Sequence, residues 1–277
     1  MNSHTALSDY GRRRKNNVAS TEESALHISK SAMAPEAVTR WWFALRNGLA
    51  AVAIVLIALG GTLCFAQREK SIPEQIEWTW EVRPLHPNSS LPNVLLLGDS
   101  ISRNYYPEVK KDLKGVANVY LMASSICVGD PRLPKEIAEF ARMEDVQFAV
   151  IHFNNGMHGW AYTEAQYKAG FPRFLHAVHG IAGKNTTLIW ASTTPVRLDD
   201  PNGASNARID KRNSIAGAFV SAEGIEIDHQ HALMLKHQDL YDDHDKGLVH
   251  FNPKGSDMQG DQAAALIRAT LVRQHAK

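Results

Sequence analysis

The sequence is poor in cysteine and has no excess of charge of either sign. Only Cys64 and Cys127 occur among 277 residues, one in an apolar run and the other in a later loop. Two cysteines so placed provide neither a disulfide framework nor a cysteine-based zinc site. The 30 basic residues face 29 acidic ones, and the formal net charge is +1. This balance gives no electrostatic reason to expect nucleic acid as a partner.

Charge is also absent from one long segment. Residues 48–66 (GLAAVAIVLIALGGTLCFA) are nineteen residues without a charged side chain, about enough apolar helix to cross a hydrocarbon layer roughly 30 Å thick. The segment predicts either a transmembrane helix or the apolar part of a signal peptide cut after Ala66, where small residues precede the cleavage point. Both interpretations stay open. In either case we expect a membrane-anchored or secreted protein whose C-terminal part is extracytoplasmic, in a periplasm or outside the cell.

The remaining chain divides by composition. Residues 1–47 are polar and partly basic without apolar periodicity, which predicts a disordered tail, and residues 67–91 contain prolines and polar residues typical of a linker. Residues 92–277 are long enough for one domain with its own core. We therefore expect a tail, a membrane or signal segment, a linker and one folded domain.

Apolar runs alternate with amphipathic stretches in the folded part. The runs have the length and apolar content of buried strands; they are 93–98, 118–123, 146–153, 186–192 and 224–228. The stretches predict helices near 103–114, 132–142, 163–182, 206–222 and 254–273. Nearly all-apolar strands, each followed by a helix, indicate a parallel sheet covered on both faces. We expect an α/β fold, a three-layer α/β/α sandwich with a five-stranded parallel sheet in flavodoxin-like order.

A serine directly follows the first predicted strand, in the run Gly98, Asp99, Ser100. In such a sheet, ligands bind at the carboxyl ends of the strands. A hydroxyl at a strand-to-helix turn lies at that edge, and the helix N-terminus offers N–H groups to a developing oxyanion. Ser100 is therefore the candidate nucleophile, although the same three residues also suit an ordinary helix cap.

A histidine suited to act as the base stands near the other end of the chain. His250, in VHFNPKG, precedes the last predicted helix, so it can return to the same sheet edge and accept the serine proton. Together, GDSI near the start, HFNNGMH in the middle and VHFNPKG before the last helix resemble the conserved blocks of the SGNH (GDSL-like) hydrolases. The resemblance extends from about Pro92 to the end of the chain.

The resemblance implies that Ser100 is the nucleophile and His250 the general base. It also implies an oxyanion hole built from the N–H of Ser100, a glycine N–H of the second block and an asparagine side chain. The second-block loop follows the second predicted strand at residues 124–129, and the middle motif HFNNGMH belongs to the third block. Gly129 is the best glycine in the second-block loop, and it also suits a plain turn.

The third block departs from the usual G-x-N-D. With Gly156 aligned on its glycine, His158 stands at the asparagine position and Gly159 at the aspartate position, while Asn154 and Asn155 lie just upstream. Either a neighbouring asparagine supplies the amide donor or His158 donates from its ring. We prefer Asn154 with His158 close by.

The last block departs as well, because Gly247 stands three residues before His250, where the family usually has an aspartate. Asp245 is the nearest carboxylate, with Asp243 and Asp242 behind it. One of them is expected to hold the tautomer of His250, or else a Ser-His dyad acts without an acid.

The sequence therefore predicts a serine esterase that needs no cofactor. By the resemblance, short acyl groups such as acetyl on carbohydrate are the expected substrates. The alternatives are a non-catalytic glycan-binding domain, motivated by the two altered blocks, and an acyltransferase with a sugar acceptor. The run Asp228, His229, His231 has metal-ligand residue types, but no second cluster completes a site, so no metal is expected.

Overall fold

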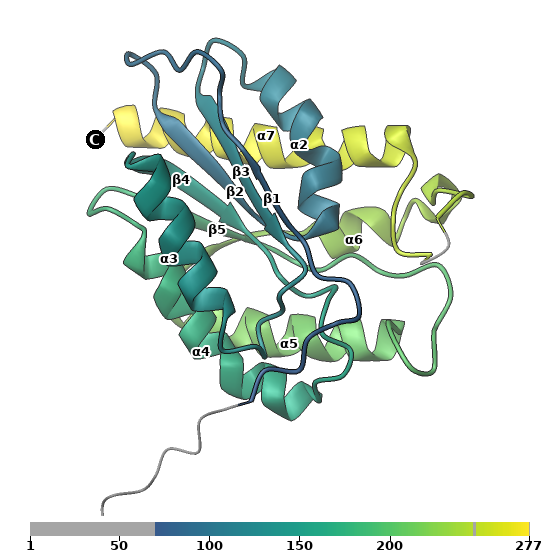
Figure 1. Cartoon of the computed structure of the whole chain (residues 1–277). Coiled ribbons are helices and arrows are strands. Elements are labelled where there is room, and N and C mark those ends of the chain that lie inside the picture. Colours follow the sequence, from purple (N-terminus) through teal and green to yellow (C-terminus); the bar gives the residue numbers. More distant parts are fainter. Residues whose placement is uncertain (1–69, 246–247, 277) are drawn as a thin grey trace, which may run out of the picture. The chain divides into compact units, whose positions relative to one another are not determined.

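A computed structural model describes residues 70–245 and 248–276 (Figure 1). The tail predicted at 1–47 and the apolar segment 48–66 lie outside the described residues. None of the helices in the described part of the chain is both long and apolar enough to cross a bilayer.

One six-stranded sheet forms the centre of this domain, in the order β1-β3-β2-β4-β5-β6. The strands are β1 (Thr79–Val82), β2 (Asn93–Gly98), β3 (Asn118–Ser124), β4 (Phe148–Phe153), β5 (Thr187–Ala191) and β6 (Glu226–Asp228). From β2 to β6 the neighbouring strands pair in parallel. These five have the order 2-1-3-4-5 of flavodoxin-like sheets. The predicted α/β fold with a mostly parallel sheet is confirmed.

The sheet has six strands, however, and not the predicted five. The additional strand, β1, lies within the predicted linker and pairs antiparallel with β3, with Thr79 opposite Ser124. Four residues of the sequence TWEV are too few to reveal an alternating pattern, and they sit among polar residues and prolines. Trp78 and Val82 nevertheless pack against a buried cluster of the domain, so tertiary packing forms a strand that local sequence does not predict.

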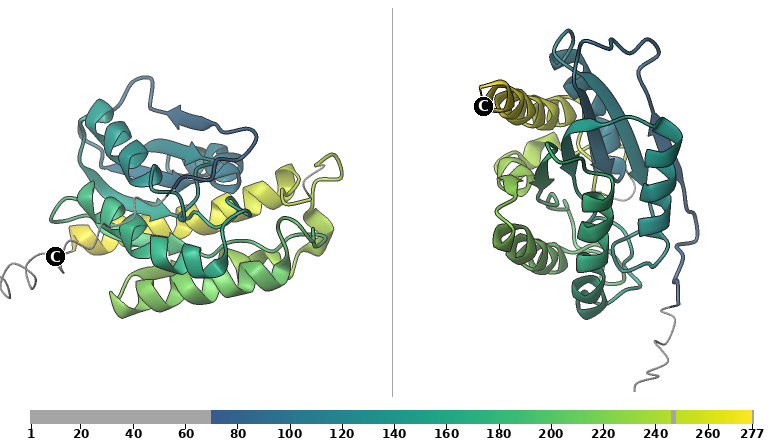
Figure 2. Two further views of the ribbon diagram at one scale, coloured as in Figure 1. Left: turned by 60° about the horizontal axis from the view of Figure 1, so that its bottom comes forward. Right: turned by 90° about the vertical axis from the view of Figure 1, so that its left-hand side faces the viewer.

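Helices cover both faces of the sheet (Figure 2). They are α2 (Ser100–Asp112), α3 (Leu133–Glu144), α4 (Glu164–Gly180), α5 (Asn206–Ala222), α6 (Gln230–Met234) and α7 (Pro253–His275), with a short 3₁₀ helix at Gln238–Leu240. Alternate strand residues face opposite layers. Val94 and Leu96 belong to the cluster with α2 and α7, whereas Leu95 and Leu97 join the cluster with α3, α4 and α5.

The N-terminal caps of α2 and α7 lie in loops at the carboxyl edge of the sheet. Asp99 caps α2 by accepting from Ile101 N–H at 3.0 Å, and Asn252 caps α7 by accepting from Gly255 N–H at 3.0 Å. Capping oxygens of this kind satisfy N–H groups that have no partner within the helix. The two caps hold the helices that follow the predicted nucleophile and base.

Candidate active site

Ser100 is the first residue of α2 and is 6% exposed. The turn before it needs glycine, because a Cβ on Gly98 would lie 2.2 Å from Ser102 Oγ and 3.3 Å from Asn154 O. Beyond its cap role, Asp99 accepts from the N–H of Met157 at 3.3 Å through its second oxygen. Asp99 therefore links the serine turn to the loop that follows β4.

His250 contacts Ser100 across 150 residues of sequence. Its Nε2 lies 2.8 Å from Ser100 Oγ, and its Nδ1 lies 3.2 Å from Asp245 Oδ1. The second Asp245 oxygen accepts from the N–H groups of His250 at 2.8 Å and Val249 at 2.7 Å. The three residues are thus arranged as a hydroxyl, a base and a carboxylate that orients the base.

The electrostatics of Asp245 favour its charged form. Partial burial alone raises the pKa of this carboxyl, but the N–H groups of His250 and Val249 and the charge of His250 outweigh burial and lower the pKa below its ordinary value. A carboxylate that stays ionised can stabilise the imidazolium that forms when the serine proton is taken.

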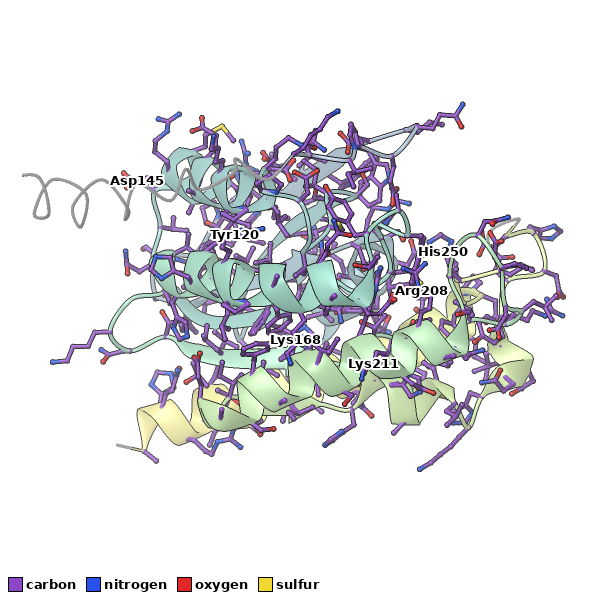
Figure 3. All side chains as sticks on the ribbon, turned by 90° about the horizontal axis from the view of Figure 1, so that it is seen from below. Tyr120, Asp145, Lys168, Arg208, Lys211 and His250 are labelled. Carbon is purple, nitrogen blue, oxygen red and sulfur yellow. The ribbon has the colours of Figure 1, made fainter. Side chains whose placement is uncertain are left out.

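The loop that carries His250 is tied at several points. Asp242 N–H donates to His250 O at 3.0 Å, Arg197 N–H donates to Leu248 O at 3.0 Å, and Tyr241 forms an isolated antiparallel bridge with Phe251. Leu248 has a φ of 55°, an unusual value for a bulky residue. In Figure 3, His250 lies at the opposite end of the domain from Asp145, which precedes β4, as expected for the carboxyl edge.

The structure gives Asn154, our preferred oxyanion donor, other partners. Its Nδ2 donates to Ala191 O and lies 3.2 Å from Thr193 Oγ1, and its backbone N–H donates to Leu97 O at 2.8 Å. The Asn154 amide therefore joins the ends of β4 and β5. The sequence alone does not indicate these contacts, because Thr193 and Ala191 lie 39 and 37 residues away.

Asn155 and Gly129 are likewise used in packing the second-block loop. Asn155 accepts from Val128 N–H at 3.1 Å and donates to Ile126 O at 2.9 Å. A Cβ on Gly129 would lie 2.7 Å from the Tyr162 ring, so glycine is required there for close packing. The Asn155 amide thus has two partners in this loop, while the predicted role of the Gly129 backbone N–H stays a prediction.

His158 differs from the two asparagines. Its Nδ1 lies 3.0 Å from Glu74 Oε2, its ring meets Trp78 edge to face at 5.5 Å, and its Nε2 is buried without a hydrogen-bond partner among the described residues. The other Glu74 oxygen accepts from Gly159 N–H at 2.7 Å. Among the predicted third-block donors, His158 therefore has a ring nitrogen that is not already hydrogen-bonded within the described part of the chain.

Arg212, on α5, holds the same loop from the other side, and no sequence motif marks it. It is 1% exposed, and its guanidinium donates to the carbonyls of Gly156, His158 and Gly159 at 2.7–3.1 Å. Its Cζ lies 4.0 Å from the Trp160 ring centroid, a favourable cation–π position. The sequence does contain one sign of a special role for Arg212. It is a charged residue on the buried face of a predicted helix, at helical spacing from Ile209 and Ala216.

Residues 70–78, here called the N-terminal strap, bind the second- and third-block loops although the sequence predicts a linker there. Glu77 receives two bonds from Arg132, at 2.8 and 2.6 Å. The remaining contacts join Ser71 Oγ to Asp130, Ile72 N–H to Tyr162 Oη, and Trp78 N–H to Ser125 Oγ. No sequence motif marks the strap, because its role depends on distant partners.

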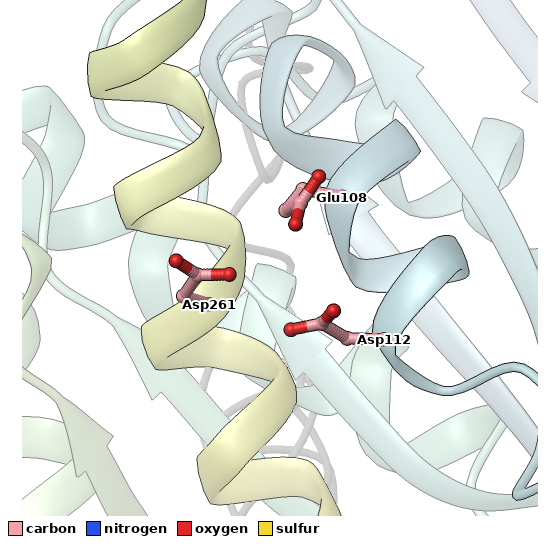
Figure 4. A group of neighbouring side chains, drawn as sticks. All are labelled: Glu108, Asp112 and Asp261. Atoms are coloured by element: carbon pink, nitrogen blue, oxygen red, sulfur yellow. The ribbon is translucent and has the colours of Figure 1, made fainter.

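The Asp228 run has a structural use in the fold. Asp228 and His152 are each 1% exposed, and the His152 Nε2 lies 2.8 Å from Asp228 Oδ2; His231 Nδ1 instead lies 2.8 Å from Thr193 O. A separate acidic group, Glu108, Asp112 and Asp261, lies between α2 and α7 (Figure 4). Such surface groups commonly hold no ion, and nothing else at this one indicates a ligand.

Comparisons with known proteins identify the fold. No protein-family model matches the sequence, and no curated protein is significantly similar to it. A carbohydrate esterase family 3 protein from Talaromyces cellulolyticus is 15% identical and covers 66% of this chain and 99% of its own, with a TM-score of 0.51. LAE5, an alpha/beta hydrolase from the metagenome of Lake Arreo, is 11% identical and covers 65% of this chain and 96% of its own, with a TM-score of 0.51.

A member of the lipolytic G-D-S-L family from Veillonella parvula is 16% identical and covers 63% of this chain and 97% of its own, with a TM-score of 0.49. At these identities the likeness concerns the fold. The likeness to the Talaromyces cellulolyticus esterase and to LAE5 confirms the fold that the sequence resemblance implies.

Proposed function

We propose that this chain is a serine esterase with Ser100 as nucleophile, His250 as general base and Asp245 as the carboxylate that orients it. The observation that carries the proposal is the 2.8 Å distance between Ser100 Oγ and His250 Nε2. It joins residues 150 positions apart, with the Asp245 carboxylate 3.2 Å from the other ring nitrogen. Local capping does not require this arrangement, whereas acyl transfer does.

The reaction proceeds through an acyl-enzyme. Ser100 Oγ attacks the ester carbonyl carbon while His250 Nε2 takes the hydroxyl proton, and the carbonyl oxygen becomes an oxyanion. The C–O bond to the alcohol then breaks, and His250 returns the proton to the leaving alkoxide. Water attacks the acyl-enzyme with His250 again as base, which releases the acid and restores the serine.

We propose a short-acyl ester as substrate, with an acetylated carbohydrate as the first class to test. The support is the family resemblance and the carbohydrate esterase family 3 protein among the structural neighbours. Because residues 48–66 form an uncharged run, we also propose that the enzyme is membrane-anchored or secreted and acts outside the cytoplasm.

A fluorophosphonate probe tests the nucleophile. Labelling is expected in the unaltered chain and is lost in Ser100→Ala. Ser102→Ala is the matched control, because Ser102 lies two residues further along α2, is buried like Ser100, and bonds Tyr105 Oη at 3.0 Å instead of a histidine. A folded chain that takes no label, yet is retained by a glycan column, would favour the binding-domain alternative.

Product analysis then separates hydrolysis from acyl transfer. The chain is incubated with p-nitrophenyl acetate in the presence and absence of a free sugar, and the fate of the acetyl group is followed. Free acetate in both samples supports the esterase. Acetyl recovered mainly on the sugar would assign the same site to an acyltransferase.

A further inference from the structure

The unpartnered Nε2 of His158 is the feature of the site that the triad does not use. The His158 side chain is 16% exposed, and Nε2 is buried without a hydrogen-bond partner among the described residues. Buried polar atoms are nearly always bonded, because an unmade bond costs about 1–3 kcal/mol. A donor left without a partner in the free protein is available to a group that arrives with the substrate.

The neighbours of His158 place it beside the serine turn. Met157, the preceding residue, donates to Asp99, which directly precedes Ser100. The Trp78 ring, in contact with His158, also lies 5.2 Å from Arg103 Cζ, and Arg103 is one turn after Ser100 on α2. The imidazole therefore shares its neighbours with the first turn of the helix whose N-terminus carries the nucleophile.

The charged groups around His158 favour its protonated form. Burial lowers the pKa of the imidazole, and the Arg212 charge acts in the same direction, but the Glu74 hydrogen bond and the Asp99 and Glu74 charges outweigh them and raise the pKa above 6.5. Burial raises the pKa of Glu74, but the bonds from His158 and Gly159 N–H lower it overall below 4.5. Both shifts favour the form of the contact in which an imidazolium is bonded to a carboxylate.

We propose that His158 donates a charged hydrogen bond from Nε2 to the oxyanion of the tetrahedral intermediate, and that Glu74 of the N-terminal strap is its positioning residue. This inference rests on the proposed esterase function. His158 would then act where the family has a neutral asparagine amide, and the esterase site would contain two histidine–carboxylate pairs with opposite tasks. His250 must be neutral to take a proton, whereas His158 must be charged to stabilise the oxyanion.

A charged donor has one consequence that a neutral amide lacks. Hydrogen bonds from an ionised donor are roughly twice as strong as neutral ones, so turnover should fall when His158 loses its proton. The rate with p-nitrophenyl acetate should therefore decline at alkaline pH. Its leaving group needs no protonation, so this decline does not report the acid role of His250.

The test compares pH profiles of kcat and KM between pH 6 and 10. Glu74→Gln should lower kcat about 10- to 100-fold at neutral pH, a fraction of what losing a whole oxyanion donor costs. It should move the alkaline decline to lower pH and leave KM within about twofold, because ester binding does not use the charge. Glu77→Gln is the matched control on the same strap, since Glu77 bonds Arg132 and not a histidine.

His158→Asn keeps a neutral donor and decides the question if Glu74→Gln does not fold. It should retain part of the activity and show no alkaline decline. The inference is overturned if the unaltered chain, Glu74→Gln and His158→Asn share one alkaline decline, or if Glu74→Gln changes only KM and stability. Failure of the proposed esterase function is distinguishable from failure of the His158 inference, because Ser100 of the unaltered chain would then not be labelled by the fluorophosphonate.

Discussion

His250 and His152 both contact an aspartate, but their surroundings differ. The His250 and Asp245 side chains are 26% and 13% exposed, and the histidine has a serine hydroxyl at 2.8 Å. The His152 and Asp228 side chains are each 1% exposed, and the second ring nitrogen of His152 lies 3.4 Å from Tyr105 Oη. The same pair of residue types thus occurs once at an accessible edge and once in the interior.

Access to the sheet edge, and not the histidine–aspartate pair itself, separates a candidate catalytic contact from a structural one. Burial raises the pKa of Asp228, but bonds from His152, Gln230 and Gln262 outweigh it and hold the pKa below its ordinary value. Each polar atom of that carboxylate already has a protein partner. Asp228 is therefore a buried charge stabilised by its donors, whereas Asp245 contacts a histidine whose other ring nitrogen lies 2.8 Å from the Ser100 hydroxyl.

The largest expected effect separates the two histidines by activity and stability. His250→Gln should lower kcat/KM by on the order of 10⁴–10⁶, as loss of a triad base does, with little change in urea unfolding. His152→Leu should keep kcat per folded molecule and lower the free energy of unfolding by about 1–3 kcal/mol, because Asp228 loses a donor in the interior. Steady-state kinetics and urea titration of both variants are the measurements. Equal losses of activity in His250→Gln and His152→Leu would contradict the distinction between a catalytic and a structural histidine.

The next effect concerns the carboxylate of the accessible pair. Asp245→Asn should lower kcat about 10²- to 10⁴-fold, because an amide can still accept the two backbone N–H bonds but no longer stabilises the imidazolium. Asp243→Asn is the control, since the Asp243 side chain is 79% exposed and pairs with Arg197. Activity retained in Asp245→Asn would instead point to a Ser-His dyad.

The candidate nucleophile and base could be predicted because each follows a local rule. Ser100 stands where an apolar strand ends and a helix begins, and His250 precedes the last helix, so topology alone places both at one edge. For the carboxylate that orients His250, the sequence leaves three candidates, because Asp245, Asp243 and Asp242 share one loop. Loop geometry, including the positive φ of Leu248, then decides among them.

The oxyanion side and the strap could not be predicted in this way. The partners of Asn154 and Asn155 lie in β5 and in other loops, so amide identity alone does not say where the donors point. Glu74 lies 84 residues from His158, in a segment whose prolines and polar residues suggest a linker. Contacts of this kind depend on the folded arrangement of loops, which neither periodicity nor capping rules describe.

A smaller effect is expected from removing the guanidinium that holds the third-block loop. Arg212→Met should lower kcat about 10- to 100-fold, because the carbonyls of Gly156, His158 and Gly159 lose a shared donor and the loop shifts by a fraction of an ångström. Lys211→Met is the control, as the neighbouring residue on α5 is exposed. Kinetics should be read beside thermal unfolding, because leaving buried carbonyls unpaired also destabilises the fold. An unchanged kcat would assign Arg212 to stability alone.

The smallest effect is the pH dependence of the Glu74–His158 contact. Glu74 has a lowered pKa, so its contribution is present above about pH 4.5 and is lost as pH falls through the folded-state value. His158 has a raised pKa, so its contribution is complete below about pH 6.5 and is lost as pH rises through the folded-state value. The difference in unfolding free energy between the unaltered chain and Glu74→Gln should therefore be greatest between these limits, at about 1 kcal/mol.

Urea titrations of both proteins at pH 4, 5.5, 7 and 9 measure this difference. Because the two proteins are compared at the same pH, the titration of other groups contributes equally to both unfolding free energies and cancels from their difference. Glu77→Gln should show no loss of its effect toward pH 9, since the guanidinium of Arg132 stays charged throughout. A Glu74→Gln difference that is equally large at pH 5.5 and 9 would mean that His158 is not the titrating partner. His158 would then not donate a charged hydrogen bond from Nε2, while the Ser100–His250 pair would be unaffected.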